Sequence, residues 1–281
     1  MEKKLRFGIL AAVVMLLPGV AGAAPETPIE EWTGKTAMLI GAHPDDDTFA
    51  HGTLAMLKAH GNDVWVVLLT TGNVGTQDPD MSRFELATVR RQEELAALAE
   101  LGIPESHYIN LGYDDGLLEF QDEMEVVGQL VRLIRKIRPD VLFAFDPGPT
   151  YRRWHKTDHR AASYLAADAT RAAMWRLLFE GQIIQEGLQA HRIPEFLFFD
   201  SPEGADNLWV DITAFAEKRV NAGMKYVSQW GPGWSDYKGP DLSPEESKAM
   251  EERIRGRLTI RDGKTVEGFR YYEGQPDSMG K

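Results

Sequence analysis

The stretch Met38-Leu-Ile-Gly-Ala-His-Pro-Asp-Asp-Asp47 decides the fold. It begins as an apolar run that is typical of a buried strand, and it ends in one histidine and three aspartates. Packing alone gives a buried strand no reason to end in four side chains that can bind metal or move protons. Polar clusters of this kind lie at the carboxyl edge of α/β sheets, where ligands bind in that architecture. The stretch therefore predicts a strand that delivers a functional site to the edge of a sheet.

Segments of strand and helix type alternate along the rest of the chain. Strands are expected at residues 36–42, 63–71, 108–111, 141–145, 195–199 and 208–212, and helices at 48–60, 81–101, 124–137, 161–178, 214–228 and 244–257. This alternation predicts an α/β fold with a mostly parallel, doubly wound sheet. After Trp230 the chain is rich in glycine and proline, and its only expected element is the charged helix at 244–257.

A second polar cluster, Trp154-His-Lys-Thr-Asp-His-Arg160, follows the fourth expected strand. Because parallel strands place their carboxyl ends at one edge, the two clusters are expected to meet. Two histidines and one carboxylate make a zinc-binding set that leaves a fourth position open for water. A metal-bound water has its pKa lowered towards ~7, and a spare carboxylate can take its proton during attack. Asp45 and Asp46 could supply the ligand and the base.

Residues 1–23 have the pattern of a secretory signal peptide. The apolar part is shorter than the ~20 residues that a membrane span needs, so we expect cleavage rather than a stable transmembrane anchor. The mature protein is then expected in the periplasm or outside the cell. The features of the signal peptide are a basic start at Lys3, Lys4 and Arg6, an apolar run at 7–20, and small residues at 21–23.

Composition narrows the class of protein further. The chain has no cysteine, which excludes a disulfide framework, so stability must come from a packed core. Its formal net charge of -12 argues against broad binding of nucleic acid, and a small molecule or a glycan is the expected partner. No linker divides the chain, so we expect an extended lead-in at residues 24–35 and a single domain at 36–281.

The motif Ala42-His-Pro-Asp-Asp46, taken with Asp158-His-Arg160, resembles the PIG-L/LmbE-like family of zinc-dependent N-deacetylases. The resemblance covers roughly residues 36–230. It implies a Rossmann-like fold and hydrolysis of an N-acetyl group, usually on an N-acetylglucosamine derivative. Supporting stretches are Gly52-Thr-Leu54, Leu69-Thr-Thr-Gly72, Arg90-Arg-Gln-Glu93, Leu101-Gly-Ile103, Tyr113-Asp-Asp-Gly116 and Val210-Asp-Ile-Thr213.

The resemblance also implies a role for each motif residue. His43, Asp46 and His159 would bind Zn²⁺, although two histidines and one aspartate suit several divalent metals. Asp45 would be the general base for water attack on the amide, and Asp158 would orient a neighbouring histidine. Weaker candidates, for contact with the substrate, are Arg90, Asp115, Asp146 and Lys156.

The second motif departs from the family's usual His-x-Asp-His, because this chain has His155-Lys-Thr-Asp-His159. In the family a protonated histidine would stabilise the oxyanion together with the metal and then protonate the departing amine. We favour His155 for this role over Lys156, since histidine exchanges its proton near neutral pH. Two smaller departures are Asp47, where glutamate is usual and which could cap the next helix, and His51, where a small residue is usual.

The sequence thus predicts an exported, zinc-dependent hydrolase that removes the N-acetyl group from an N-acetylglucosamine-containing substrate. One alternative is an amidase that acts on a different acyl-amine. Another is a carbohydrate-binding protein with a degenerate site, which the shifted His155 and several tryptophans suggest. These tryptophans are Trp154, Trp175, Trp209, Trp230 and Trp234. The isolated His60, His107 and His191 are interpreted as surface or structural residues, and Glu93 as a structural one.

Overall fold

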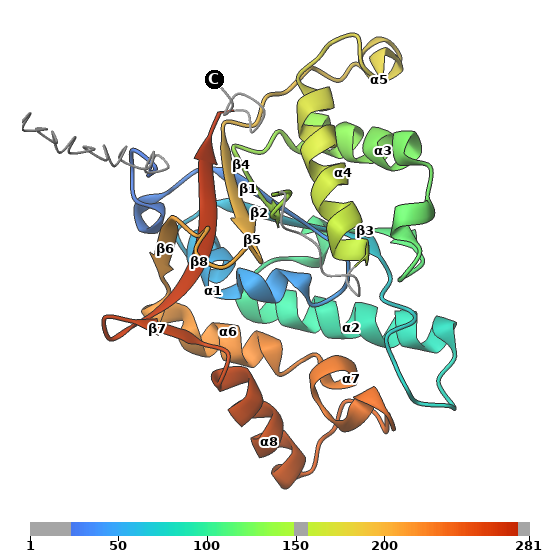
Figure 1. Ribbon diagram of the computed structural model, residues 1–281, viewed down its shortest axis with the longest axis vertical. Helices are drawn as coiled ribbons and strands as arrows, with labels where there is room; N and C mark the ends of the chain where they lie inside the picture. Colours follow the sequence, from blue (N-terminus) through green and yellow to red (C-terminus); the bar gives the residue numbers. More distant parts are fainter. Residues whose placement is uncertain (1–23, 149–156, 275–281) are drawn as a thin grey trace, which may run out of the picture.

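The computed structural model describes residues 24–148 and 157–274, and Figure 1 shows how its elements are arranged. Among these residues no helix combines the length and the apolar character required to cross a membrane. The expected signal peptide and the pair His155 and Lys156 lie outside the described residues.

A central sheet carries the fold, with strand order β3-β2-β1-β4-β5-β8-β6 and β7 paired to β8. The first five strands in this order run parallel, whereas β8 pairs antiparallel with β5, β6 and β7. The predicted α/β fold with a mostly parallel sheet is therefore confirmed. The strands are β1 (Thr36–Gly41), β2 (Asp63–Thr70), β3 (Tyr108–Tyr113), β4 (Val141–Phe145), β5 (Glu195–Phe199), β6 (Leu208–Asp211), β7 (Thr259–Arg261) and β8 (Lys264–Glu273).

Helices cover the sheet in two groups (Figure 1). One group contains α3 and α4, which pack on each other, and the other contains α1, α2 and α6. With both faces covered, every residue of β4 is buried, as are all residues of β1 after the first, which explains their continuous apolar sequence. The helices are α1 (His51–Ala59), α2 (Arg83–Leu101), α3 (Glu123–Ile137), α4 (Thr157–Ala173), α5 (Glu180–Ile184), α6 (Ala216–Gly223), α7 (Val227–Trp230) and α8 (Pro244–Arg255).

The lead-in at residues 24–35 is not simply extended. It contains a 3-10 turn at Ile29–Glu31, and Ile29 and Trp32 are buried in the main core. The Trp32 indole N–H also donates to the carbonyl oxygen of Thr27. These two apolar side chains fix the segment to the domain, which its proline and glutamate content did not indicate.

The C-terminal strands β7 and β8 were not predicted. β8 has charged residues at two inward positions, which breaks the apolar pattern by which strands are recognised. Both charges are paired over a long range, since Glu267 bonds to Arg219 and Arg270 pairs with Asp146. A strand of this kind can be identified only when its partners are known.

The start of α1 also differs from expectation. A 3-10 turn at Asp46–Phe49 precedes the helix, and neither turn nor helix has a side-chain cap at its own N-terminus. Glu267 of β8 instead accepts hydrogen bonds from the backbone N–H groups of Gly52 and Thr53, at 2.9 and 2.8 Å. Asp47, the expected cap, is fully buried and bonds to other side chains. The acceptor for the free helix amides thus comes from the far end of the chain.

Candidate active site

The polar loop after β1 is held in shape by one of its own carboxylates. Oδ2 of Asp46 accepts the backbone N–H groups of Ala42 and His43, at 2.6 and 2.7 Å. The loop crosses so close to β1 that a Cβ atom at Gly41 would lie 2.9 Å from that of Asp46. Glycine at this position therefore permits the turn that presents Asp46.

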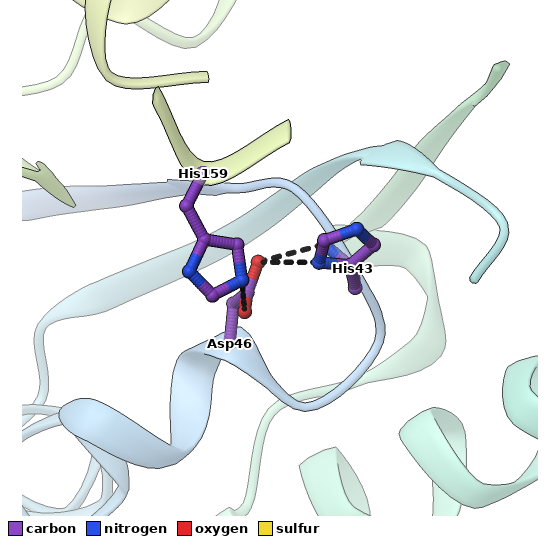
Figure 2. A group of neighbouring side chains, drawn as sticks. All are labelled: His43, Asp46 and His159. Carbon is purple, nitrogen blue, oxygen red and sulfur yellow. Dashed lines mark hydrogen bonds and ion pairs between the residues drawn. The ribbon is translucent and has the colours of Figure 1, made fainter. Parts of the chain in front are cut away.

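The three predicted metal ligands converge, as Figure 2 shows. Nε2 of His159 lies 3.1 Å from Oδ1 of Asp46, and Nδ1 of His43 lies 3.6 Å from Oδ2 of Asp46. His159 comes from the first turn of α4 and stacks on Phe145 at the end of β4, with the ring centroids 4.1 Å apart. Burial alone would raise the pKa of Asp46, but the two imidazoles outweigh it and hold this pKa well below its usual value.

The other ring nitrogen of His43 faces two carboxylates. Nε2 lies 3.1 Å from Oδ1 of Asp115 and 3.3 Å from Oδ2 of Asp158. Burial acts to lower the pKa of His43, but Asp115, Asp158 and Asp46 together raise it well above its usual value. A carboxylate on the far nitrogen is the usual way in which a protein orients a metal-binding histidine. The contact leaves Nδ1 as the nitrogen directed at Asp46.

Asp158 connects the site to the loop after β3 as well. Its carboxylate accepts the backbone N–H groups of Gly116 and Leu118, at 2.7 and 3.2 Å. Asp158 itself lies in the first turn of α4, which begins at Thr157. Asp158 therefore fixes the turn that carries Asp115 next to His43.

This donor set fits a divalent cation. One ligand atom from each of His43, Asp46 and His159 can lie within 4.8 Å of the other two. Two imidazoles and one carboxylate form a set found in catalytic zinc sites, although geometry and softness allow other divalent metals. Asp45 and Asp115 add negative charge around the three ligands, so the pocket favours a cation.

Asp45 sits beside the ligands in an unusual backbone conformation. Its φ is 117°, a value that residues other than glycine rarely adopt. The carboxyl group of Asp45 lines the cleft. Burial and the nearby charge of Asp46 raise the pKa of Asp45 to about 6, with Arg90 acting in the opposite direction. A carboxylate with a pKa near the working pH is suited to general-base catalysis.

Arg90 lies under the loop that follows β2. Its Nη2 donates to the carbonyl oxygen of Gly75 at 2.6 Å, and Nη1 is 3.9 Å from Oδ2 of Asp115. A Cβ atom at either Gly72 or Gly75 would come within 2.7 Å of the guanidinium, so both glycines make room for it. Arg90 and Asp115, which the sequence offered as substrate contacts, both line the cleft.

Asp146 is not where the sequence suggested. It is fully buried, pairs with Arg270, and accepts the backbone N–H of Gly148 at 2.7 Å. It is absent from the side chains that line the cleft in the described part of the chain. The strand that supplies Arg270 was itself not predicted, so the partner of Asp146 could not be foreseen.

The contacts of residues 228–230 with the loop after β1 and with Glu93 were not predicted. Nε1 of Trp230 donates to Oδ2 of Asp45 at 3.1 Å, and Nε2 of Gln229 donates to the carbonyl oxygen of Pro44 at 2.7 Å. The neighbouring Ser228 donates its backbone N–H and its hydroxyl to the buried Glu93. The segment at α7 thus holds the His-Pro-Asp-Asp loop, and the only sequence signal was the tryptophan itself.

A buried polar network lies behind the loop. The Tyr226 hydroxyl is 3.0 Å from both Oδ1 of Asp47 and Oε2 of Glu94, while Nε2 of His51 is 2.8 Å from Oδ2 of Asp47. Burial and the Asp47 charge raise the pKa of Glu94 well above its usual value. A protonated Glu94 can donate to the Tyr226 oxygen, which leaves the tyrosine hydrogen for Asp47. His51 is therefore a buried structural group, in contact with Asp47.

The isolated residues have structural contacts. His107 stacks on Trp65 with the ring centroids 4.1 Å apart, and Nε2 of His191 is 2.7 Å from the carbonyl oxygen of Pro139. Glu93 is buried against Ser228. These contacts agree with the structural interpretation of all three residues.

The metal-binding group opens into a cleft of about 1030 Å³, at the upper end of the ~300–1,000 Å³ typical of small-molecule sites. Part of the cleft lining comes from the C-terminal part of the chain, including Trp209, Trp230, Trp234, Arg253 and Arg257. The cleft therefore offers room and aromatic surface beyond the metal-binding group.

The fold and the site together define a Rossmann-like α/β protein with a metal-binding centre of two histidines and one aspartate. The model of the family described as "PIG-L: GlcNAc-PI de-N-acetylase" matches residues 38–170, which include both motifs. The chain belongs to the PIG-L family of N-deacetylases.

Individual relatives agree with this assignment. The chain is 31% identical over 241 residues to diacetylchitobiose deacetylase of Thermococcus kodakarensis, which covers 85% of this chain and 82% of that protein. It is 32% identical over 176 residues to 1D-myo-inositol 2-acetamido-2-deoxy-alpha-D-glucopyranoside deacetylase of Streptomyces scabiei, over 53% of this chain and 54% of that protein. Its structure is similar to that of N,N'-diacetylchitobiose deacetylase from Pyrococcus horikoshii, with a TM-score of 0.71, 27% identity, and coverage of 85% and 84%.

Proposed function

We propose that this protein removes the N-acetyl group from an N-acetylglucosamine-containing substrate, with zinc at the centre formed by His43, Asp46 and His159. The observation that carries the proposal is the position of Asp45, a partly buried carboxyl with a raised pKa that lines the same cleft as that centre. When bound, the metal supplies a Lewis acid that polarises the amide carbonyl and acidifies water.

The residues of the chain divide the remaining work. Asp45 accepts the proton of the attacking water as the new C–O bond forms, and Trp230 holds its carboxylate in place through the indole N–H. Asp158 and Asp115 keep His43 turned so that Nδ1 faces Asp46. Arg90 and the Trp230 side of the cleft are available to bind the sugar.

Two roles fall to residues of the segment 149–156. We propose that His155 stabilises the developing oxyanion and then protonates the departing amine, with Lys156 as the alternative. A pH profile of kcat in His155→Gln and Lys156→Gln would separate the two, because the residue that protonates the amine should abolish the alkaline limb of the profile when it is replaced.

The sugar is inferred from the relatives. Two of them are named as deacetylases of diacetylchitobiose and of an acetamido-glucopyranoside, and both substrates contain a 2-acetamido sugar. The same site chemistry would serve an amidase acting on another acyl-amine, because the metal and its base do not select the amine. The substrate panel must therefore include amides without a sugar.

Amine release tests the proposal. The purified protein would be stripped of metal, restored with zinc, manganese or iron, and assayed on N-acetylglucosamine, diacetylchitobiose and N-acetylated amines without a sugar. We expect release that needs metal, is highest with zinc, favours the sugars, and is lost in Asp45→Asn. Release only from non-sugar amides would favour the amidase alternative. Sugar binding without release, unaffected by Asp45→Asn, would favour a carbohydrate-binding protein.

We also propose that the protein is exported, on the basis of the basic and apolar segments within residues 1–23. Mass spectrometry of the protein from secreted or periplasmic fractions should give an N-terminus at Ala24. A full-length chain retained in the cytoplasm would contradict export and would leave the catalytic proposal unaffected.

A further inference from the structure

Two arginines from the C-terminal part of the chain stand on one wall of the cleft. Arg253, in the last turn of α8, donates from Nη1 to the carbonyl oxygen of Trp230 at 2.6 Å. Arg257, just after α8, places its guanidinium carbon 3.9 Å from the centroid of the Trp230 ring. Both residues line the cleft, and both are largely exposed. One tryptophan therefore fixes two positive charges at the surface of the same cavity.

Neither arginine has an ion-pair partner among the described residues, although the chain is acidic. Arg255 lies between them in sequence but points elsewhere, and it pairs with both Glu217 and Glu251. The arginine that does not line the cleft is thus paired with carboxylates, whereas the two that line it have no ion-pair partner among the described residues. Arg253 and Arg257 both contact Trp230, and their like charges repel each other. An anion bound between them would therefore be stabilised.

Trp230 also sets the position of this pair relative to the reaction. Its indole N–H bonds to Asp45, while its ring carries Arg257. The Trp230 side chain therefore separates Arg257 from the proposed base, and Arg253 contacts the backbone of the same tryptophan. A molecule whose acetamide group reaches Asp45 would bring a neighbouring substituent to the arginines.

We propose that Arg253 and Arg257 bind an anionic group of the substrate, a carboxylate or a phosphate, so that the preferred substrates are negatively charged N-acetylglucosamine derivatives. The inference rests on the proposed function. Guanidinium groups suit this role because their planar N–H donors match the oxygens of carboxylate and phosphate. They would also offset the repulsion between an anionic substrate and a chain with a net charge of -12.

Three matched substrates test the proposal: methyl N-acetyl-β-D-glucosaminide, which is neutral, N-acetylglucosamine 1-phosphate and N-acetylmuramic acid. Their kcat/KM values would be measured for the wild type, Arg253→Gln and Arg257→Gln. Lys248→Gln is the control, because it removes one positive charge from an exposed position of α8 that does not line the cleft. We expect at least one anionic substrate to be preferred by the wild type and by Lys248→Gln. The ratio of anionic to neutral kcat/KM should fall roughly 10- to 100-fold in the arginine variants, as the loss of a charged hydrogen bond implies.

The ratio separates binding of an anion from a structural role. If kcat/KM falls by one common factor on all three substrates, the arginines act only by holding Trp230, and the proposal is overturned. If one anionic substrate alone shows the preference, that result identifies the anionic group together with its position, a phosphate on C1 or a carboxylate on the 3-O-lactyl group.

Calorimetry of the same three molecules keeps this proposal distinct from the proposed activity. Tighter binding of an anionic sugar, lost in Arg257→Gln, would support the site even if no amine were released from any sugar. Equal affinity for charged and neutral sugars in the wild type, with no change in the variants, would overturn it.

Discussion

Trp230 donates a hydrogen bond from its indole N–H to the Asp45 carboxylate, over 3.1 Å and 185 positions of sequence. The bond ties the proposed base, at the end of the first strand, to a segment that precedes the C-terminal helix. Since Asp45 already sits at a positive φ, its carboxyl position depends on such outside support.

We expect Trp230→Phe to lower kcat roughly tenfold or more, because the loss of a hydrogen bond to a charged group costs about 1.5–3 kcal/mol. Metal content should stay unchanged, since no metal ligand is altered. Trp234→Phe is the matched control, because Trp234 lines the same cleft and makes no side-chain hydrogen bond to Asp45. An equal kcat in the wild type and Trp230→Phe would show that the bond does not position the base.

Asp158→Asn should weaken zinc binding about 10- to 100-fold, the usual effect of losing a carboxylate behind a metal-binding histidine. The physical reason is the 3.3 Å contact between Asp158 and Nε2 of His43. Competition with a chromophoric chelator would measure the dissociation constant. Asp168→Asn, an exposed change on the same helix, should leave it unaltered. If both variants bound zinc like the wild type, His43 would not depend on Asp158.

Glu267→Ala should destabilise the fold by roughly 3–5 kcal/mol, because it leaves the charge of Arg219 and the first amides of α1 without their buried acceptor. Urea unfolding would measure the loss. Glu273→Ala, at the exposed end of the same strand, should change stability by less than about 0.5 kcal/mol. Similar losses in the two variants would argue against the cap supplied by Glu267.

Burial raises the pKa of Glu93 to about 7, although Ser228 and Arg90 act to lower it. The folded state therefore keeps a proton that the unfolded chain releases near pH 4.5, and stability should fall as the pH rises from about 4.5 to 7. The full effect is on the order of 3 kcal/mol. Glu93→Gln removes this titration and can still bond to Ser228, so its melting temperature should fall less than that of the wild type between pH 5.5 and 8. Parallel decreases, measured with chelator in both samples, would contradict a protonated Glu93.

Much of the site could be predicted because the order of the parallel strands determines which residues meet at the edge of the sheet. His43 and Asp46 follow β1, and His159 follows β4, which is the direct neighbour of β1 in the parallel sheet. Two motifs that end adjacent parallel strands must meet at one edge, so their distance in sequence did not matter. Asp115 was proposed from the family resemblance alone, as a substrate contact, and the structure places it 3.1 Å from Nε2 of His43.

The other features of the fold and the site depend on individual contacts between residues far apart in sequence, and such contacts follow no periodic pattern. Glu267 and Arg270 are charged residues at inward positions of β8, so the sequence of β8 lacks the apolar pattern of a buried strand. Their charges are paired with Arg219 and Asp146, which are distant in sequence. Trp230 was interpreted only as a possible sugar-binding tryptophan, because a bond between two side chains leaves no trace in spacing. Asp47 was expected to cap a helix, but its two carboxylate oxygens contact the Tyr226 hydroxyl and Nε2 of His51.

In the proposed mechanism His43 binds the metal while Asp45 acts as the base. Measuring bound zinc per chain together with amine release in His43→Ala and Asp45→Asn tests both roles at once. We expect Asp45→Asn to retain one zinc and to lose turnover by a factor of about 100 or more, in the range known for general-base catalysis. His43→Ala should lose both zinc and turnover. Retention of zinc and activity in His43→Ala, or normal turnover in Asp45→Asn, would show that these residues do not have the proposed roles.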